Sequence, residues 1–420
     1  MNKAEWPMKP LALVCQIKPP KAEARRNVSA SDLVSFAPME DLGINQKFLT
    51  ATRTRPLAEV AGSYTYFADG DVLLAKITPC FENGKLGIAA NLKNGIGFGS
   101  SEYIVFRPGP SVDKEWLYYF LSRESFRTEV AERMSGAVGH KRVAKDFIES
   151  YPILIPPLPE QQRIVGILDE AFDGIATAKA NFETNLQNAR ALFESHLQSV
   201  FSVRPELVEG CGEGWDRVTL ETLLERGWIE SHLDGNHGSD YPRKDEFISE
   251  GVPYISANCL DDERLDMSRA KYLSPSRAAL LRKGIAKDKD VLFAHNATVG
   301  PVAILRTDEE KVILGTSLTY YRCNPKHILP EYLAHYMRSF GFKTQYLQVM
   351  GQSTRNQVPI TKQREFFHVI PPLEEQKQII VALDGLFENG QRLVSLYQRK
   401  LAALDALKKS LLHQAFSGQL

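Results

Sequence analysis

The chain has 420 residues, with 51 basic and 51 acidic side chains, a formal net charge of zero and 43% hydrophobic residues. This length predicts two to four domains, and zero net charge excludes a histone-like binder whose affinity comes almost entirely from counterion release. Five scattered cysteines and the lack of a long apolar run exclude a disulfide framework, a cysteine zinc site and a membrane span, so we expect a cytoplasmic protein.

Residues 1–155 are expected to form a first α+β domain. Runs such as DVLLAKI and EYIVFRP predict short strands, and residues 115–134 have the pattern of an amphipathic helix. Two polar segments are candidates for DNA contacts, because such side chains donate to phosphates or pair with base edges. The candidates are Lys76, Thr78 and Lys85 after the DVL strand, and His140, Lys141, Arg142 and Lys145 in the loop SGAVGHKRVAKDF.

A long helix is predicted over residues 156–203. It opens with the Pro pair of PPLPEQQ, where the first turn needs no N–H donor, and acidic and Gln residues follow in that turn. Alternating spacings of four and three residues predict a heptad-like seam that continues through His196 to Val200. Its helix-pairing positions are Leu168, Phe172, Ile175, Phe182, Leu186 and Phe193.

Residues 204–370 are expected to form a second α+β domain that opens with a linker at 204–214. Strand-like runs such as DVLFAHN and SLTYYRC recur here, and residues 331–350 predict a second amphipathic helix. The candidate DNA contacts are His295, Asn296 and Thr298 after the DVL strand, and Gln352, Ser353, Thr354, Arg355, Asn356 and Gln357 in the loop GQSTRNQVPITKQ. Solvated loops and ordinary turns are the alternative interpretation of all these polar segments.

A second long helix is predicted over residues 371–420, opening with PPLEEQK. The same spacing gives it the pairing positions Leu383, Phe387, Val394, Tyr397, Leu401, Leu404 and Leu411. Residues 155–202 align with residues 370–417 without a gap, which indicates a tandem duplication of one domain plus its helix.

Two copies of a long helix in one chain predict an antiparallel coiled coil with pseudo-twofold symmetry. This pairing would place the two globular domains at opposite ends. The alternative is that each helix packs only on its own domain.

No catalytic motif is present in the sequence. It contains no G-x-x-x-x-G-K-[ST], N-P-P-[YF], H-E-x-x-H or G-x-S-x-G. His232 and His237 with Asp234 have the composition of a metal cluster, but they have no counterpart in the first half and no helix to fix their geometry. We therefore expect neither a catalytic residue nor a metal site in this chain.

The layout resembles the specificity subunit of type I restriction–modification systems. The resemblance covers essentially the whole chain and rests on the doubled P-P-L-x-E-Q-x-x-I, the polar loop ahead of each copy and the D-V-L-[LF]-A strand in each half. It implies two target recognition domains that each read one part of a bipartite DNA site, with the paired helices setting the gap between the parts.

The resemblance also implies partners and cofactors. The expected partners are double-stranded DNA, two adenine methyltransferase subunits, and motor–nuclease subunits. S-adenosylmethionine, ATP and Mg are then expected in those partner subunits and no cofactor in this chain. One rival is a coiled-coil scaffold with two ligand-binding domains that do not bind DNA; another is a fused modification enzyme or nuclease.

Overall fold

The computed structural model describes residues 6–26, 28–51, 53–137, 140–202, 214–236, 241–261, 264–351 and 356–420. The predicted linker at 204–214 therefore lies outside the described residues except for Gly214. Contacts divide the chain into a first unit, Met1–Glu183 with Gln398–Leu420, and a second unit, Thr184–Tyr397. Within the described residues, no helix is both long and apolar enough to cross a membrane. The predicted α+β class, with a long helix after each globular domain, is confirmed.

The first domain is built on two sheets and a strand pair. One sheet has the order β2-β9-β6-β7, the other β4-β3-β8-β5, and β1 pairs with β10. The strands are β1 (Met8–Pro10), β2 (Cys15–Ile17), β3 (Leu33–Ala37), β4 (Arg53–Pro56), β5 (Thr65–Ala68), β6 (Val72–Ala75), β7 (Leu86–Ile88), β8 (Ile96–Gly99), β9 (Tyr103–Pro108) and β10 (Pro152–Leu154). Most residues of β6 and β8 are buried, because each of these strands lies inside its sheet.

Short helices complete the first domain. They are α1 (Leu11–Val14), α2 (Leu57–Val60), α3 (Lys114–Ser122), α4 (Glu124–Glu132) and α5 (Lys145–Ser150). The single helix predicted over 115–134 is wrong, because Arg123 has extended backbone angles (φ −61°, ψ 136°) and separates α3 from α4. This turn lets Trp116 of α3 and Phe126 of α4 both enter the same core, where both are fully buried.

The second domain has two sheets and two strand pairs. The sheets have the orders β12-β22-β19-β20 and β13-β17-β14-β21-β18, and the pairs are β11-β23 and β15-β16. The strands are β11 (Asp216–Thr219), β12 (Ile229–Asp234), β13 (Phe247–Ile248), β14 (Val252–Ile255), β15 (Leu260–Asp261), β16 (Arg264–Leu265), β17 (Lys271–Leu273), β18 (Ile285–Ala286), β19 (Val291–Asn296), β20 (Thr298–Ile304), β21 (Val312–Leu314), β22 (Leu318–Cys323) and β23 (Phe367–Ile370).

The helices of the second domain follow the pattern of the first. They are α7 (Leu220–Glu225), α8 (Pro275–Ala279), α9 (Pro330–Arg338), α10 (Phe340–Gly351) and α11 (Ile360–Gln363). The helix predicted over 331–350 is also divided, here at Ser339 (φ −66°, ψ 156°). The duplicated break shows that the turn between the two helices belongs to the repeated fold.

The long helices are α6 (Leu158–Ser202) and α12 (Leu373–Phe416). Each is held at its start by one buried glutamine. Gln161 Nε2 donates to the carbonyls of Pro156 and Ser111 at 2.8 and 2.9 Å, and its Oε1 accepts from the Asp113 amide at 2.8 Å. Gln376 makes the same three bonds, to Pro371, His327 and Leu329. This side chain is the physical reason for the repeated E-Q in both halves.

The two long helices run antiparallel within each unit. In the first unit, Lys408 Nζ lies 5.0 Å from the Phe172 ring centre, Lys179 pairs with Asp405, and Lys400 Nζ lies 5.2 Å from the Phe182 ring. Position along α6 therefore rises as position along α12 falls. In the second unit, the rings of Phe193 and Phe387 are 5.5 Å apart, and Val200, further along α6, lines the same hollow as Ile379, which comes earlier in α12.

The structure buries the predicted pairing positions at least partly and leaves most of their neighbours exposed. The predicted seam differs from the structure at His196. This side chain is exposed, whereas the next residue, Leu197, is buried, with 5% of its surface exposed. The seam shifts by one residue there because the apolar side chain takes the inward position and the imidazole turns to solvent.

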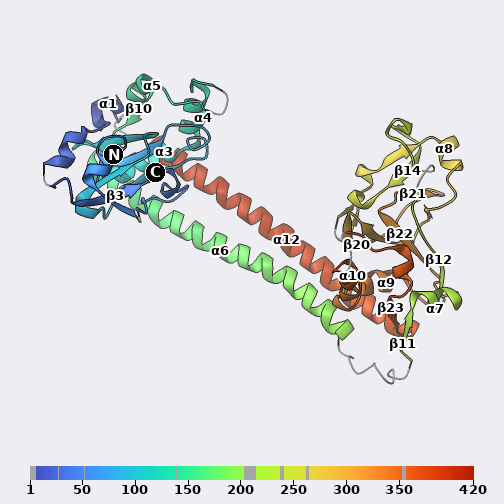
Figure 1. Ribbon diagram of the computed structural model, residues 1–420. Helices are drawn as coiled ribbons and strands as arrows, with labels where there is room; N and C mark the ends of the chain where they lie inside the picture. The colour runs from blue at the N-terminus through green and yellow to red at the C-terminus, as the bar shows by residue number, and fades with distance from the viewer. Residues whose placement is uncertain are drawn as a thin grey trace. The chain divides into compact units, whose positions relative to one another are not determined.

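The last turns of α12 belong to the core of the first domain. Leu412, Ala415 and Phe416 lie in one apolar cluster with Trp116 of α3, and Figure 1 shows this end of α12 against the domain that contains α3. The first turns of α6 are in the same cluster, through Leu168. Each long helix thus packs on a domain and on the other helix, so compact units and predicted domain boundaries do not coincide.

Candidate nucleic-acid interface

The DVL strand of each half is fixed by the aspartate that precedes it. Asp71 accepts two bonds from Arg107, Nε to Oδ1 and Nη2 to Oδ2, both at 2.8 Å. Asp290 accepts the same pair from Arg322, at 2.9 and 2.7 Å. Burial raises the pKa of both carboxyls, while the paired guanidinium opposes that shift. Both aspartates are 1% exposed, so each carboxylate is held inside the domain, where its paired guanidinium anchors the strand.

In the first unit, the two predicted polar segments lie side by side. The amide of Thr78 donates to the Lys141 carbonyl at 3.0 Å, and the amide of Val143 donates to the Lys76 carbonyl at 3.0 Å. Ile77 and Arg142 form an antiparallel bridge between them. The segment after strand β6 and the loop ahead of α6 therefore form one surface, although the sequence separates them by about 65 residues.

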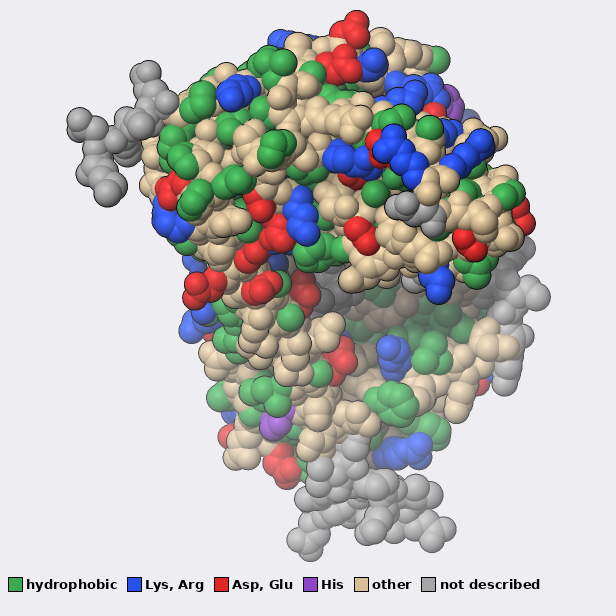
Figure 2. All heavy atoms as spheres, turned by 90° about the vertical axis from the view of Figure 1, so that its left-hand side faces the viewer, with side chains coloured by type: hydrophobic (Ala, Val, Ile, Leu, Met, Phe, Trp, Pro, Cys, Tyr) green, Lys and Arg blue, Asp and Glu red, His purple; other side chains and the backbone are tan. Residues whose placement is uncertain are grey.

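Charges on this surface are partly paired. Arg142 Nη2 and Nε donate to the Glu102 carboxylate at 2.9 and 3.0 Å, and Lys76 Nζ lies 3.9 Å from it. The hydrogen bond from Arg142 lowers the pKa of Glu102, so the carboxylate is ionised at neutral pH. His140, Lys141 and Lys145 are exposed. Figure 2 shows Lys and Arg side chains gathered on part of the face of the first unit that is turned to the viewer.

The backbone of Lys85 hydrogen-bonds beside this surface, but its side chain is bound elsewhere. Its carbonyl accepts from the Ala75 amide at 3.1 Å, next to Lys76. Its Nζ, however, donates to the Met39 carbonyl at 2.6 Å. The ammonium is thus engaged in holding the loop that contains Met39, and its predicted DNA contact stays a prediction.

The second unit repeats the arrangement with different side chains. The Ala297 amide donates to the Asn356 carbonyl at 3.0 Å, and the Val358 amide donates to the His295 carbonyl at 2.8 Å. Asn296 bridges Gln357, and Asn356 Nδ2 donates to the Ala297 carbonyl at 2.6 Å. Thr298 is exposed at the start of β20. Gln352, Ser353, Thr354 and Arg355 lie outside the described residues.

His295 differs from the expectation for a DNA contact. It is 1% exposed, and its Nδ1 lies 3.0 Å from the carbonyl of Val358. His295 is part of strand β19, in which every residue from Val291 to His295 is buried. Its burial leaves it under the surface, where it supports the loop, and Asn296 is the first residue of this segment that reaches outward.

A buried glutamine that the sequence analysis missed holds the second loop from below. Gln363 Nε2 donates to the Val358 carbonyl at 3.2 Å. Its Oε1 lies 3.0 Å from the hydroxyls of Thr319 and Tyr321 and 3.1 Å from Nε2 of His232. His232 is therefore a core residue, and burial lowers its pKa to about 4. The corresponding position of the first half is the buried Ile148, so the repeat carried no signal for this network.

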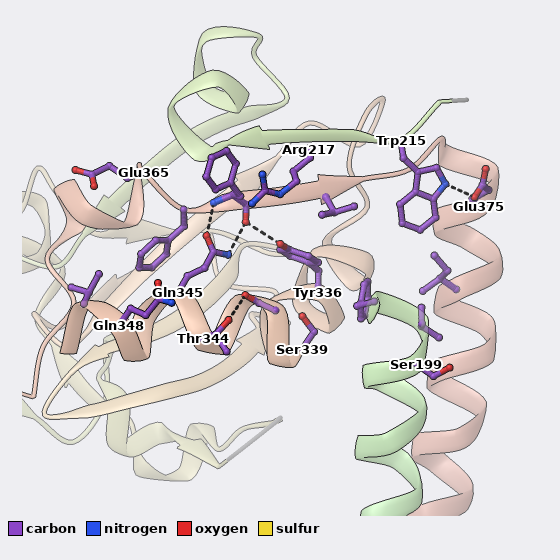
Figure 3. A pocket seen from close by; sticks show the side chains of 18 of the residues that line it. Ser199, Trp215, Arg217, Tyr336, Ser339, Thr344, Gln345, Gln348, Glu365 and Glu375 are labelled. Carbon is purple, nitrogen blue, oxygen red and sulfur yellow. Dashed lines mark hydrogen bonds between the residues drawn. The ribbon is translucent and has the colours of Figure 1, made fainter. Parts of the chain in front are cut away.

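A hollow of about 1040 Å³ in the second unit lies beside the strand pair β11-β23 (Figure 3). Gln345 lies along the edge of β23: its Nε2 donates to the Phe367 carbonyl at 3.0 Å and its Oε1 accepts from the Phe367 amide at 2.7 Å. Trp215 Nε1 donates to Glu375 at 2.7 Å across the hollow's rim. The Gln345 amide thus closes the edge of β23, and the lining carries both acidic and basic residues, so the chemistry of this hollow does not favour DNA.

The sequence matches the family described as "Type I restriction modification DNA specificity domain" over residues 42–184 and 233–396, which is more than half of the chain. It is 32% identical over 209 residues to the EcoAI specificity subunit of Escherichia coli and 34% identical over 194 residues to the EcoEI specificity subunit. These matches cover 48% and 46% of this chain but only 35% and 32% of those relatives.

The chain is similar over a longer stretch to the EcoKI specificity subunit of Escherichia coli K12. The identity is 22%, and the match covers 82% of this chain and 76% of that protein. Two solved structures share the fold over 99% of the chain, both at 18% identity. One is a chain from a study of complex assembly and conformational transition in the type I R-M system, with a TM-score of 0.77 covering 98% of that chain. The other is the HsdS subunit of Thermoanaerobacter tengcongensis, with a TM-score of 0.66 covering 97% of that chain.

Proposed function

Because the chain belongs to the family of type I restriction–modification DNA specificity domains, we propose that it is the DNA-specificity subunit of such a system. Each domain reads one part of a bipartite, gapped DNA site, and the paired helices determine the gap. Family membership favours this function over the scaffold that does not bind DNA.

The observation that carries the proposal is the duplicated surface formed by the polar loop and the DVL strand. The same backbone hydrogen bonds join these segments in both units, but the side chains on them differ. The first surface carries Lys76, Lys141 and Arg142, and the second carries Asn296, Asn356 and Gln357. A shared scaffold with different donors is what two readers of different half-sites require, since base edges are distinguished by donor and acceptor patterns.

We further propose that the chain does no chemistry and works in the cytoplasm. Two adenine methyltransferase subunits, with S-adenosylmethionine, and motor–nuclease subunits, with ATP and Mg, carry out modification and cleavage. The purified chain should therefore neither methylate nor cut DNA when these cofactors are added.

The test is co-expression with a methyltransferase subunit of the same system, followed by genome-wide mapping of methylated adenines. One gapped motif is expected, with one adenine modified in each half. Loss of methylation when this chain is omitted is also expected. Methylation at ungapped or unrelated sequences, or methylation that persists without this chain, would contradict the proposal.

A further inference from the structure

A strongly basic hollow of about 420 Å³ lies in the first unit beside the loop that follows His140. Five cationic side chains line it: Lys18, Lys21, Lys76, Arg142 and Lys145. None of the described residues that line it is Asp or Glu. The chain as a whole has no net charge, so this concentration of positive charge is local and favours an anionic ligand.

Two of the ammonium groups are held in place at the wall. Lys21 Nζ donates to the Gly62 carbonyl at 2.7 Å, and Lys76 Nζ donates to the Ser101 carbonyl at 2.9 Å. An ammonium has three N–H donors, so each lysine can still donate to a ligand. Two carboxylates offset part of this charge: Glu102 pairs with Arg142 and lies 3.9 Å from Lys76 Nζ, and Glu149 pairs with Lys145.

One wall of the hollow is aromatic. Tyr64 is partly exposed, and its ring is set edge-on to Phe36 with the centroids 4.8 Å apart. Tyr66 stands beside it and is 5% exposed. The volume falls in the range of about 300–1,000 Å³ that is common for small-ligand sites. A phosphate of an undistorted duplex would interact with the cationic side chains alone. The aromatic wall adds a surface on which a base can stack, so the hollow as a whole suits a base joined to a phosphate.

We propose that this hollow binds one nucleoside phosphate, with the base against Tyr64 and the phosphate at the ammonium groups of Lys18, Lys21 and Lys145. The ligand has two sources: a nucleotide of the bound DNA that has left the base stack, or a free mononucleotide. The first source rests on the proposed function, and the second does not.

The DNA source is tested with the full chain in its methyltransferase complex. 2-Aminopurine is placed in turn at every position of the gapped site except the methylated adenines, since its fluorescence rises when it unstacks. One position should brighten on binding, Tyr64→Ala should remove the signal, and Tyr64→Phe should keep it. Tyr241→Ala, which changes an exposed tyrosine of the second unit, is the matched control and should leave the signal unchanged.

The free source is tested by titrating the full chain with the four deoxynucleoside 5′-monophosphates and, separately, with inorganic phosphate. Base stacking is worth about 1–3 kcal/mol, so Tyr64→Ala should weaken mononucleotide binding at least about fivefold. The same variant should leave phosphate binding unchanged, and the double variant of Lys21→Ala and Lys145→Ala should weaken both.

A response in either arm supports the site and identifies its source. The inference is overturned if no DNA position brightens and, in addition, either Tyr64→Ala leaves mononucleotide binding unchanged or inorganic phosphate binds as tightly as the mononucleotides. Absence of any binding to gapped DNA would instead contradict the proposed function, and the mononucleotide titration would still decide the inference.

Discussion

Phe416 of α12 packs against Trp116 of α3, with the ring centroids 4.3 Å apart. Phe201, at the equivalent position of α6, packs against Tyr332 and Tyr336 of α9, at 5.9 and 5.6 Å. In both units the last turns of one half's long helix complete the core beside the other half's domain. A phenylalanine recurs at this position because the duplication also repeated the group of aromatic side chains against which it packs.

Phe416→Ala should therefore destabilise the first unit. Loss of a largely buried aromatic ring costs about 3 kcal/mol. Denaturant unfolding, followed by limited proteolysis to identify the fragment released first, would measure the loss. Phe201→Ala is the matched variant and should expose the second unit first; equal effects of both variants on both units would contradict this assignment.

Gln161→Leu should destabilise the junction between the first domain and α6. The substitution removes three hydrogen bonds and leaves the Asp113 amide and two carbonyls unpaired, at a cost of about 2–4 kcal/mol. Gln162→Leu, one residue further along the same turn and exposed, should change the free energy of unfolding by less than about 0.5 kcal/mol. Similar losses for the two variants would show that the buried amide does not hold the helix.

The second unit should lose stability in acid before the first. Burial lowers the pKa of both His232 and His368 to about 4, below the usual value near 6.5. The unfolded chain then binds more protons than the folded one between these values. The stabilisation from the neutral rings is complete above about pH 6.5 and falls as pH drops toward 4, by about 3 kcal/mol for each ring at most.

Urea unfolding at pH 7 and pH 5, with the two units distinguished by proteolytic fragments, measures this difference. His232→Gln should reduce the pH dependence of the second unit, even if it lowers stability at pH 7. His140→Gln replaces an exposed histidine of the first unit. It should change neither the pH dependence of the second unit nor its stability at pH 7. A pH dependence that His232→Gln leaves intact would assign the effect to other groups.

Replacing both Lys141 and Arg142 by alanine should weaken binding through the first half-site only. Loss of two cationic contacts should also lower the number of counterions released on binding by up to about two, which the slope of affinity against salt concentration measures. The decrease is smaller if Arg142 of the unsubstituted chain stays paired with Glu102 in the DNA complex. Binding to DNA variants mutated in one half-site at a time, at several salt concentrations, provides the measurement.

The double variant Asn356→Ala and Gln357→Ala is the counterpart for the second half-site. It removes neutral donors, so it should relax base preference there with little change in salt dependence. Loss of recognition at both half-sites by either double variant would show that these loops do not act locally.

The sequence by itself determined the duplication, the two long helices and the seam along them, because helix periodicity and a Pro-Pro entry are local features of the chain. It also pointed to both polar loops. Only the tertiary structure decided which parts meet: that the loop at Lys141 hydrogen-bonds to the strand end at Lys76, that Phe416 enters the first domain, and that His295 is buried while Asn296 reaches outward. These outcomes depend on contacts between distant segments, and no local pattern of residues encodes them.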